Sequence, residues 1–575
     1  MFLPTIRQEM KALGWPELDI ILVTGDAYID SPHIGVAVIG KVLLKAGYRV
    51  GIIAQPALNV PDDITRLGEP RLFWGVTGGS IDSMIANYTA SMKKRRSDDY
   101  TPGGLNNRRP DRAVIVYTNL IRQYFKNTRP IVLGGIEASL RRVAHYDYWS
   151  NSVRRSILFD AKADFIVYGM AERTLPELAD ALKRDADYRN IRGICYAATQ
   201  KPEETLELPP YEKVTVNSQA FVRMFHEFYH QNDPITSRRL CQRHATRWLV
   251  HNPPALPLSQ SELDEVYNLN YERDVHPYYA RSGQIKALET IRFAITTHRG
   301  CYGECNFCAI AMHEGRTVQS RSQESILNEA RHFTTMPGFK GIIADVGGPT
   351  ANMYDFECRK KLTDGSCPNK RCIYPEICPQ MPVNHKKQIE LLARLSAIPG
   401  VRKVFVASGI RHDLVLADQK WGKKYLRVVV EEHTSGQMKI APEHIVTKIL
   451  RLMGKPDQKS LIEFAKLFYR YTQMAGKKQF LTYYLIAAHP GCTLEDMQKL
   501  KTFATDFMKI APEQVQIFIP APSTYSALMY HTGLDPFTGK NIFVAKNQAE
   551  KESQKLLVTD KKEIPSKNRA KFRHE

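Results

Sequence analysis

Short apolar runs alternate with longer amphipathic stretches along the first 200 residues. Residues 20–23 form an apolar run that ends before a glycine, a helical pattern follows, and residues 50–54 are apolar again. The same rhythm continues at residues 113–119, 130–135 and 163–182. Short runs of this kind are typical of buried strands, and strands that alternate with helices indicate a parallel sheet covered on both faces. We therefore predict an α/β domain over residues 1–200.

A second alternating series occupies residues 286–540. Its strand-like runs are separated by helical stretches and lie at residues 291–301, 339–350, 401–411, 436–444, 480–491 and 515–523. Six such runs predict a partial (β/α)6 barrel, and in barrels of this kind the loops at the carboxyl ends of the strands form the active site.

Three segments lack this rhythm. Residues 93–112 are polar and rich in turn formers, which predicts a long surface loop. Residues 201–285 are punctuated by proline, so we expect a connecting region, in which Ser259 and Glu262 predict a capped helix start. Residues 541–575 are mixed in charge and rich in lysine, which predicts a basic, disordered tail.

Composition narrows the class of protein. With 575 residues, of which 43% are hydrophobic, the chain is long enough for at least two cores. No apolar run reaches 18 residues and the N-terminus lacks the layout of a signal peptide, so we expect a cytoplasmic protein without a membrane partner. The net charge of +20 suits nucleic acid, an anionic cofactor or an acidic partner, and equally a merely soluble surface.

The cysteines carry the strongest chemical signal. Seven of the ten lie between positions 301 and 378, and clustered cysteines in a cytosolic protein hold metal more often than they form disulfides. The other three, Cys195, Cys241 and Cys492, have no partner by spacing, and we assign them no role.

Cys301, Cys305 and Cys308 form a C-x3-C-x2-C arrangement directly after a predicted strand. Three thiolates on one short loop can hold three corners of a [4Fe–4S] cluster and leave the fourth iron open for another ligand. The alternative is a zinc site completed by His313. Zinc prefers four protein ligands, usually in two separated pairs, and the strand-then-loop context favours the cluster.

This segment resembles the signature of radical S-adenosylmethionine (SAM) enzymes, with Phe307 at the position of the motif's aromatic residue, against the adenine. The resemblance implies that SAM binds the open iron. An electron, from a reductant such as flavodoxin or ferredoxin, then cleaves SAM to a 5′-deoxyadenosyl radical that takes hydrogen from a substrate. In such enzymes the protein positions the cofactor and excludes competing reactions.

Two later strand ends extend the resemblance to the SAM-binding residues. Gly347, Gly348 and Pro349 stand where the family has a Gly-Gly-Glu-like loop whose backbone carbonyl binds the methionine amino group; here Pro349 replaces the acid. The next strand ends in Ser408, Gly409 and Arg411, where the family contacts ribose and carboxylate. Thr493 and Asp496 begin a Pro-Gly-x-Thr-type turn that we interpret as a helix cap.

Over residues 15–540 the chain is similar to the YgiQ family of radical SAM proteins. The segments that carry this similarity are TPGG (101–104), GGIEASLRR (134–142), IYPEICPQM (373–381) and KIAPEH (439–444). The resemblance does not supply a substrate.

A second cysteine group follows the second barrel strand as an insertion at residues 358–378. Cys358, Cys367, Cys372 and Cys378 lie among polar residues in a C-x8-C-x4-C-x5-C arrangement. Four thiols can hold an auxiliary iron–sulfur cluster or a structural zinc, and free thiols or disulfides remain a third possibility.

The N-terminal domain resembles the Rossmann-like, cobalamin-binding-type domain that precedes many radical enzymes. That type carries Asp-x-His-x-x-Gly, whose histidine ligates cobalt. In this chain Asp30, His33 and Gly35 place the histidine one residue late, so we do not expect cobalamin.

Several polar residues near predicted strand ends have both a functional and an ordinary interpretation. Residues 134–137 form either a ligand loop or a tight glycine turn. Four further candidates either line a substrate pocket that faces the barrel or lie on a solvated helix face: Glu137, Arg141, Arg142 and His145. At the fifth barrel strand, Lys439, Glu443 and His444 contact substrate or form salt bridges.

Two other functions compete with the radical SAM enzyme of unknown substrate. An RNA-modifying radical SAM enzyme would carry three further cluster cysteines in its N-terminal domain, whereas this chain has only Cys195 and Cys241 before Cys301. A non-catalytic zinc or nucleic-acid-binding protein would show strands of mixed aromatic and basic residues, and we find no such motif.

Overall fold

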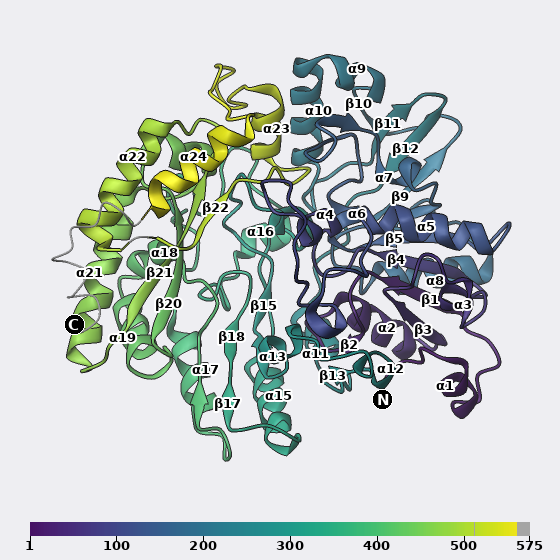
Figure 1. Ribbon diagram of the computed structural model, residues 1–575, viewed down its shortest axis with the longest axis horizontal. Helices are drawn as coiled ribbons and strands as arrows, with labels where there is room; N and C mark the ends of the chain where they lie inside the picture. The colour runs from purple at the N-terminus through teal and green to yellow at the C-terminus, as the bar shows by residue number, and fades with distance from the viewer. Residues whose placement is uncertain (511, 561–575) are drawn as a thin grey trace.

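The computed structural model describes residues 1–510 and 512–560, which form two α/β halves that lie side by side (Figure 1). The N-terminal half is built on a nine-stranded sheet of order β10-β11-β12-β9-β8-β5-β4-β1-β3. Its parallel part comprises β3 (Val50–Ala54), β1 (Ile20–Thr24), β4 (Phe73–Thr77), β5 (Ile131–Gly134) and β8 (Phe165–Val167). The sequence thus predicts the first two of these strands within one residue.

Burial on both faces explains why these strands read as continuous apolar runs. Every residue of β1 and β3 is buried, and Ile20 pairs with Val50. Helices α2 (Gly35–Lys45) and α8 (Thr174–Arg184) pack on the sheet, as expected for parallel strands joined by crossover helices.

The carboxyl edge of the sheet has a topological switch point at β1. The chain leaves β1 toward β3 on one side and then crosses to β4 on the other side. Because the loops after β1 and β4 diverge, a crevice opens between them, and crevices of this type are the usual ligand sites of open α/β sheets.

The C-terminal half contains a series of parallel strands, and each of the six predicted runs includes one. Strand β14 (Ala294–Thr296) pairs with β18 (Asp345–Gly347), and β17 (Ile342–Ile343) pairs with β19 (Lys403–Val404). Next come β20 (Gln437–Glu443), β21 (Phe480–Ala487) and β22 (Val515–Ile517). A parallel bridge from Ile410 to Ile440 continues the series toward β20.

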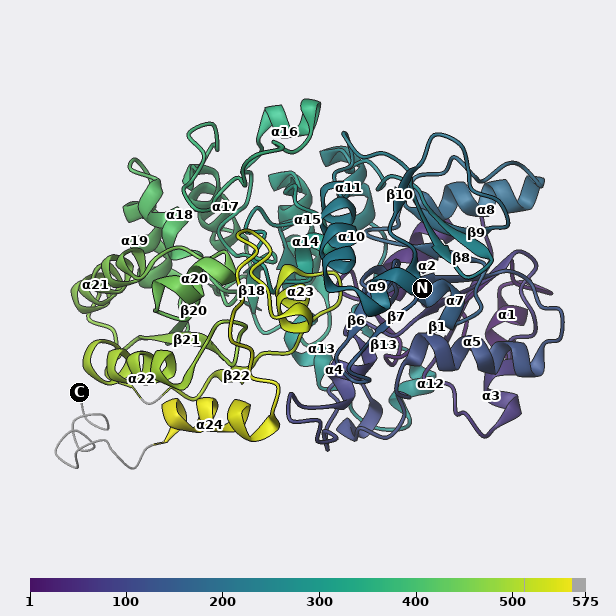
Figure 2. The ribbon, with the colours of Figure 1, turned by 90° about the horizontal axis from the view of Figure 1, so that it is seen from above.

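Helices cover the outside of these strands, as a partial barrel requires (Figure 1, Figure 2). They include α15 (Gln323–Thr335), α17 (Lys386–Ser396), α19 (Gly422–Glu432), α21 (Gln458–Met474) and α22 (Leu494–Phe503). Both predicted helix caps are confirmed: Ser259 and Glu262 form a capping box at α11 (Gln260–Tyr267), and Thr493 and Asp496 form another at α22.

The predicted strand at residues 113–119 is wrong, because these residues begin helix α5 (Ala113–Tyr124). Its buried residues, Ala113, Val114, Tyr117, Thr118, Leu120 and Ile121, recur at helical spacing. The β-branched residues of this run favour a strand. The residues that pack on the core recur every 3.6 residues, and this spacing decides for a helix. The strand actually present in this part of the sheet, β4, was not among the predicted runs.

Residues 201–285 are more than a connection. Strand β9 (Ile194–Ala198) runs antiparallel to β8, and β12 (Arg247–His251), β11 (Leu240–His244) and β10 (Leu206–Leu208) extend the sheet beyond it. Proline-punctuated loops between these short strands hide them from a periodicity argument.

The surface loop and the tail also differ from expectation. In residues 93–112, Arg109 is buried and its guanidinium pairs with Asp26, so part of this loop fills the interior. Helix α24 (Gln548–Thr559) replaces part of the expected tail and packs on α22 and β22, with Asn547 as its N-cap. Residues 561–575 lie outside the described part of the chain. Within that described part, no helix is both long and apolar enough to cross a membrane.

Candidate functional site

The three-cysteine loop follows β14 and β15 (His298–Arg299) at the mouth of the barrel. The backbone N–H of Gly303 donates to Cys301 Sγ at 3.3 Å, and Thr350 Oγ1 lies 3.4 Å from the same sulfur. Burial raises the pKa of the Cys301 and Cys308 thiols. Their environment therefore favours a neutral thiol until a metal replaces the proton.

Gly303 is required by the close approach of two sulfurs. A Cβ at this position would lie 3.2 Å from Cys301 Sγ and 3.6 Å from Cys305 Sγ. The glycine therefore keeps open the space between the two thiols. This space is bordered by two sulfurs and contains no side chain of residue 303, which fits a cluster held by this loop.

Hydrogen bonds of Asn306 fix the loop to the barrel. Its backbone N–H donates to Met453 O at 2.9 Å, its side-chain amide donates to Leu452 O at 2.8 Å, and its carbonyl accepts from Ser526 N at 2.9 Å. Residues far apart in sequence thus set the path of the cysteine loop.

A buried ion pair faces the loop. Arg411 Nη1 lies 3.9 Å from Cys305 Sγ, and the guanidinium binds Asp413 through Nη2 at 2.6 Å and Nε at 2.9 Å. Burial acts to raise the pKa of Asp413, but the Arg411 charge lowers it to about 2, so the pair is ionic at neutral pH. Arg411 would therefore offset the negative charge of cluster thiolates.

Among the described residues, no three His, Cys, Asp or Glu side chains converge on a point where one metal ion could sit. A [4Fe–4S] cubane binds each thiolate to a different iron, so its three cysteines need not converge on one point. A mononuclear zinc needs such convergence. The loop offers the three thiolates that a cluster would use, and the metal that it holds stays a prediction.

The residues expected to bind SAM divide into two groups. Gly347, Gly348, Pro349 and Ser408 line one large cavity. The others, Phe307, Gly409 and Arg411, do not line it. Phe307 packs between the cores of the two halves and meets His489 edge to face, with 6.4 Å between ring centroids.

The carbonyl of Gly347 is already used within the protein. It accepts from Thr297 N at 2.7 Å and from Thr297 Oγ1 at 3.1 Å, which accounts for both of its lone pairs. A backbone carbonyl that receives an amino group at this loop would therefore belong to Gly348 or Pro349.

The cavity lies between the two halves and has a volume of about 600 Å³, within the range of ligand sites. One wall consists of the sheet's switch point, with Asp26, Thr77 and Ser80 after β1 and β4. The opposite wall consists of the barrel strand ends that carry Thr296 and Gly348. The predicted SAM loop and the N-terminal crevice thus open into one space.

Three histidines line this cavity, and burial lowers the pKa of each to about 4. His33 Nε2 lies 3.3 Å from Thr296 Oγ1, which links the N-terminal half to the barrel. His313 Nδ1 lies 3.1 Å from Ser139 Oγ, and His298 Nδ1 lies 2.8 Å from Thr297 Oγ1. All three rings are neutral at physiological pH.

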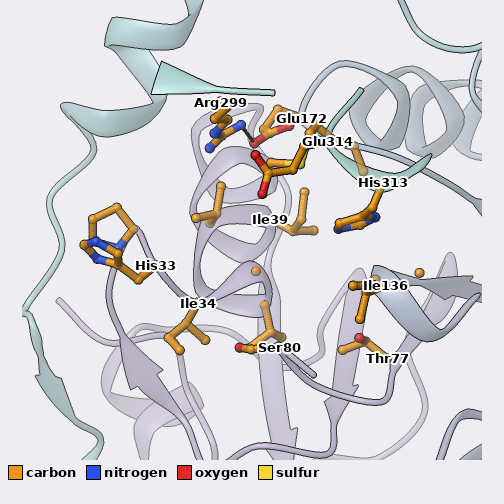
Figure 3. Close-up of a pocket in the computed structure, with 18 of the residues that line it drawn as sticks. His33, Ile34, Ile39, Thr77, Ser80, Ile136, Glu172, Arg299, His313 and Glu314 are labelled. Carbon is orange, nitrogen blue, oxygen red and sulfur yellow. Dashed lines mark hydrogen bonds and ion pairs between the residues drawn. The ribbon is translucent and has the colours of Figure 1, made fainter. Parts of the chain in front are cut away.

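The charged residues of the cavity were missed at the sequence level. Arg299 forms a buried ion pair with Glu172, and Glu314 stands beside this pair (Figure 3). The only available signal was position: Arg299 and Glu314 flank the cysteine motif on either side, and Glu172 follows β8. Nothing in the spacing of these residues showed that they face one cavity.

The candidates in residues 134–145 separate in the structure. Gly134, Gly135 and Ile136 line the cavity, which favours the ligand-loop interpretation. The charged residues of this segment do not line it. Glu137 instead accepts from Ser83 N and Val114 N, at 2.9 and 3.3 Å.

The remaining side chains of this segment also point inward. Arg141 pairs with Asp82, and Arg142 Nε donates to His251 Nε2 at 2.9 Å. His145 is buried too. Neither a substrate pocket facing the barrel nor a solvated helix face describes these residues.

The end of β20 holds a carboxyl group in an unusual backbone conformation. Glu443 has φ +66° and is buried, with Lys455 Nζ at 4.0 Å. Burial raises its pKa. Backbone strain of this kind concentrates at functional sites, but neither Glu443 nor its neighbours Lys439 and His444 line the cavity.

The second cysteine group lies beside the first. Cys358, Cys372 and Cys378 pack against the same small apolar cluster as Cys301, a cluster that includes Tyr302. Lys361 Nζ donates to Cys372 Sγ at 3.7 Å. Cys367 is not part of that contact set. Because the four sulfurs do not converge on one point, a second metal site stays a prediction.

An α/β domain joined to a partial barrel with a three-cysteine loop defines a radical SAM protein. Sequence comparison agrees, since the Radical SAM N-terminal family matches residues 2–294 and the Radical SAM superfamily matches residues 295–504. The chain belongs to the UPF0313 family, of the YgiQ type.

The curated relatives match along almost their whole length. A UPF0313 protein of Fusobacterium nucleatum subsp. nucleatum is 54% identical over 562 residues, which cover 98% of this chain and 99% of the relative. A UPF0313 protein of Thermotoga neapolitana is 50% identical over 565 residues, with the same coverage.

Solved structures match the fold at low identity. The cobalamin- and [4Fe–4S]-bound radical SAM methyltransferase TsrM of Kitasatospora setae has a TM-score of 0.51 at 14% identity, covering 93% of this chain and 81% of TsrM. The cobalamin-dependent radical SAM enzyme OxsB, bound to aqua-cobalamin and SAM, has a TM-score of 0.50 at 13% identity, covering 94% and 66%. These likenesses show the fold alone.

Proposed function

We propose that this protein is an enzyme that cleaves SAM reductively and uses the resulting 5′-deoxyadenosyl radical to take hydrogen from a substrate in the inter-domain cavity. The observation that carries the proposal is the shared cavity. The loop expected to bind SAM and the switch point of the N-terminal sheet line one shared space.

The residues that would hold the cofactors are close to that space. Cys301, Cys305 and Cys308 would ligate a [4Fe–4S] cluster, which supplies the electron for SAM cleavage. Arg411, fixed by Asp413, holds positive charge beside Cys305. The backbone of Gly348 and Pro349, which lines the cavity, would orient SAM.

Anaerobic reconstitution tests this function directly. The wild-type chain should hold oxygen-sensitive iron and, once reduced by dithionite or flavodoxin, form 5′-deoxyadenosine from SAM, measured by liquid chromatography with mass spectrometry. Cys301→Ala, Cys305→Ala and Cys308→Ala combined should abolish this product, whereas Cys241→Ala in the N-terminal sheet should not. Cleavage that persists in the triple variant would refute the assignment.

Cobalamin does not fit the residues that this chain offers. Both ring nitrogens of His33, the candidate cobalt ligand, lie near hydroxyl groups: Nδ1 is 3.4 Å from Ser31 Oγ, and Nε2 is 3.3 Å from Thr296 Oγ1. A neutral imidazole has one lone pair, and these hydroxyl groups engage both ring nitrogens within the protein. We derive no step through cobalamin.

The expectation that this chain binds no cobalamin is testable. Protein purified from cobalamin-fed cells should carry no absorbance from the corrin ring. A stoichiometric corrin signal would contradict this expectation and show that the fold binds cobalamin even though the histidine is displaced by one residue.

A further inference from the structure

The N-terminal crevice forms the part of the cavity that lies opposite the loop expected to bind SAM. It lies at the switch point between β1 and β4, where Asp26, Thr77 and Ser80 face the barrel across the cavity. Figure 3 shows Thr77 and Ser80 at one end and the Arg299–Glu172 pair at the other. Because ligands of open α/β sheets bind at such switch points, this half of the cavity is a second binding site.

The walls of this site are aliphatic. Ile34 and Ile39 project from the segment at and before α2, and Ile136 projects from α6 (Gly135–Ser139), which directly follows β5 (Figure 3). An apolar molecule would displace water from these surfaces at a gain of about 25 cal/mol per Å² buried. The lining therefore selects a ligand with an apolar body.

The charges of the site disfavour anions. Among the described residues no lysine lines the cavity, and the one guanidinium that does, that of Arg299, is engaged by Glu172 and by the Tyr267 hydroxyl at 3.0 Å. The three lining histidines are neutral. Arg142 carries a buried charge nearby, but it is fully enclosed and bonded to His251 and Asn232, so it cannot reach a ligand. A phosphate or carboxylate would meet no free cation here.

Glu314 offers a carboxyl group to a ligand, in the same cavity as the unpartnered Ser80 Oγ, Glu172 Oε2 and His298 Nε2. One of its carboxylate oxygens accepts from Gly300 N at 3.1 Å, and within the described residues no cation lies within 4 Å of it. Burial raises the pKa of this carboxyl group. It lies six residues after Cys308 on the segment that carries the cluster motif, so it faces the cavity close to the reacting centre.

We propose that the cavity binds the substrate, an apolar molecule bearing an amine, with its apolar body in the switch-point half and its amine donating a hydrogen bond to Glu314 at the opposite end, beside the Arg299–Glu172 pair. This inference rests on the proposed function, because it calls the bound molecule the substrate with which the radical would react. A carboxylate that gains an ammonium partner recovers the charge-assisted hydrogen bond that it lacks in the free protein.

Matched probes test the charge preference on the reconstituted full-length chain. Tryptamine, indole-3-propionate and 3-ethylindole share an indole body and differ in carrying a cation, an anion or no charge. Isothermal titration calorimetry should give tryptamine an affinity about tenfold or more above that of indole-3-propionate, the size of one charge-assisted hydrogen bond. Equal or inverse affinities, including no binding by any of the three, overturn the proposal.

Variants locate the preference. Glu314→Gln keeps an acceptor for Gly300 and removes the charge, so it should lower the affinity for tryptamine about tenfold and leave 3-ethylindole unchanged. Glu550→Gln, an exposed carboxylate on α24, is the matched control and should change neither. A tryptamine affinity that Glu314→Gln does not alter overturns the role of Glu314.

A cavity-filling variant separates this proposal from the radical chemistry. Ile39→Phe should abolish probe binding, with Ile39→Val as the control of fold and with the melting temperature measured for both. The triple cysteine variant should still bind tryptamine, because the site needs no cluster. If probes bind but SAM is not cleaved, the proposed function fails alone; if SAM is cleaved but probes show no charge preference, this inference fails alone.

Discussion

The two cysteine segments lie against the same apolar cluster, yet the chain holds them in different ways. The first, residues 301–308, is fixed by residues that are not cysteines: Asn306 bonds to the barrel, Gly303 makes room between sulfurs, and Arg411 supplies charge. The second, residues 358–378, has more thiols, but Cys372 accepts from Lys361 and Cys367 lies outside the shared apolar cluster. Cysteine spacing therefore reports how many ligands are available, whereas the neighbouring residues decide how each sulfur is held.

The largest expected difference separates the two complete cysteine deletions. Replacing Cys301, Cys305 and Cys308 with Ala should reduce 5′-deoxyadenosine formation below detection, since no ligand of the cluster remains. Replacing the four cysteines of residues 358–378 with Ala should keep cleavage within about tenfold of wild type, because the first cluster keeps its ligands. Loss of the first cluster in both variants would break the comparison.

Metal analysis of the triple variant isolates the second segment. It should contain about four irons or about one zinc per chain, as expected of an auxiliary cluster or a structural zinc. Mössbauer spectra distinguish cubane iron from adventitious iron. If neither metal is present and all four thiols react with an alkylating reagent under native conditions, the second site does not exist.

The next largest effect concerns the room between the sulfurs. Gly303→Ala should lower the iron retained after reconstitution severalfold, because its Cβ would lie 3.2 Å from Cys301 Sγ and 3.0 Å from Arg411 Nη1. Gly35→Ala is the control, since a Cβ there meets no atom within 4 Å. Equal iron content in the two variants would show that Gly303 is not needed for the cluster.

The cysteine loop itself was predictable because its ligands are adjacent in sequence. Three cysteines within eight residues, placed after a strand, are visible without a fold. The same holds for the buried strands β1 and β3 and for the capping boxes, whose determinants are local. Residues close together in sequence determine these features, so they can be predicted without knowledge of the fold.

The cavity was not predictable because its residues come from separate strand ends. Glu172 follows β8, Arg299 follows β14, and only the packing of the two halves brings them into an ion pair. The misassigned helix α5 shows the same limit within one element. Its β-branched residues favour a strand, and only the core contacts of Tyr117 and Ile121 decide for a helix.

A smaller effect should follow from cutting the link between the two segments. Arg371, in the second segment, donates to Glu304 O at 2.9 Å and to Asn306 Oδ1 at 2.8 Å in the first. Arg371→Ala should therefore speed the loss of iron to a chelator about two- to fivefold, consistent with partly solvated hydrogen bonds worth under about 1 kcal/mol.

The exposed Arg359→Ala is the matched control for this link and should not change the rate of iron loss. Identical rates in the two variants would mean that the second segment does not support the first.

The smallest expected effect tests whether side chains around the first loop tune the cluster rather than merely hold it. Thr350 Oγ1 lies 3.4 Å from Cys301 Sγ, and Thr350→Val removes this hydroxyl at nearly constant volume. Hydrogen bonds to cluster sulfurs stabilise the reduced, more negative state, so their loss lowers the reduction potential. One weak bond of about 0.5–1.5 kcal/mol corresponds to about 20–60 mV for one electron.

A redox titration of the Thr350→Val variant, followed by electron paramagnetic resonance, should show this shift to more negative potential with unchanged iron content. The matched change in the second segment, Lys370→Met beside Cys378, should leave the potential of the first cluster unaltered, because Lys370 lies next to a thiol outside the ligand set of that cluster. A shift of equal size in both variants would mean that the two segments act as one electrostatic unit and that their neighbours do not hold them in different ways.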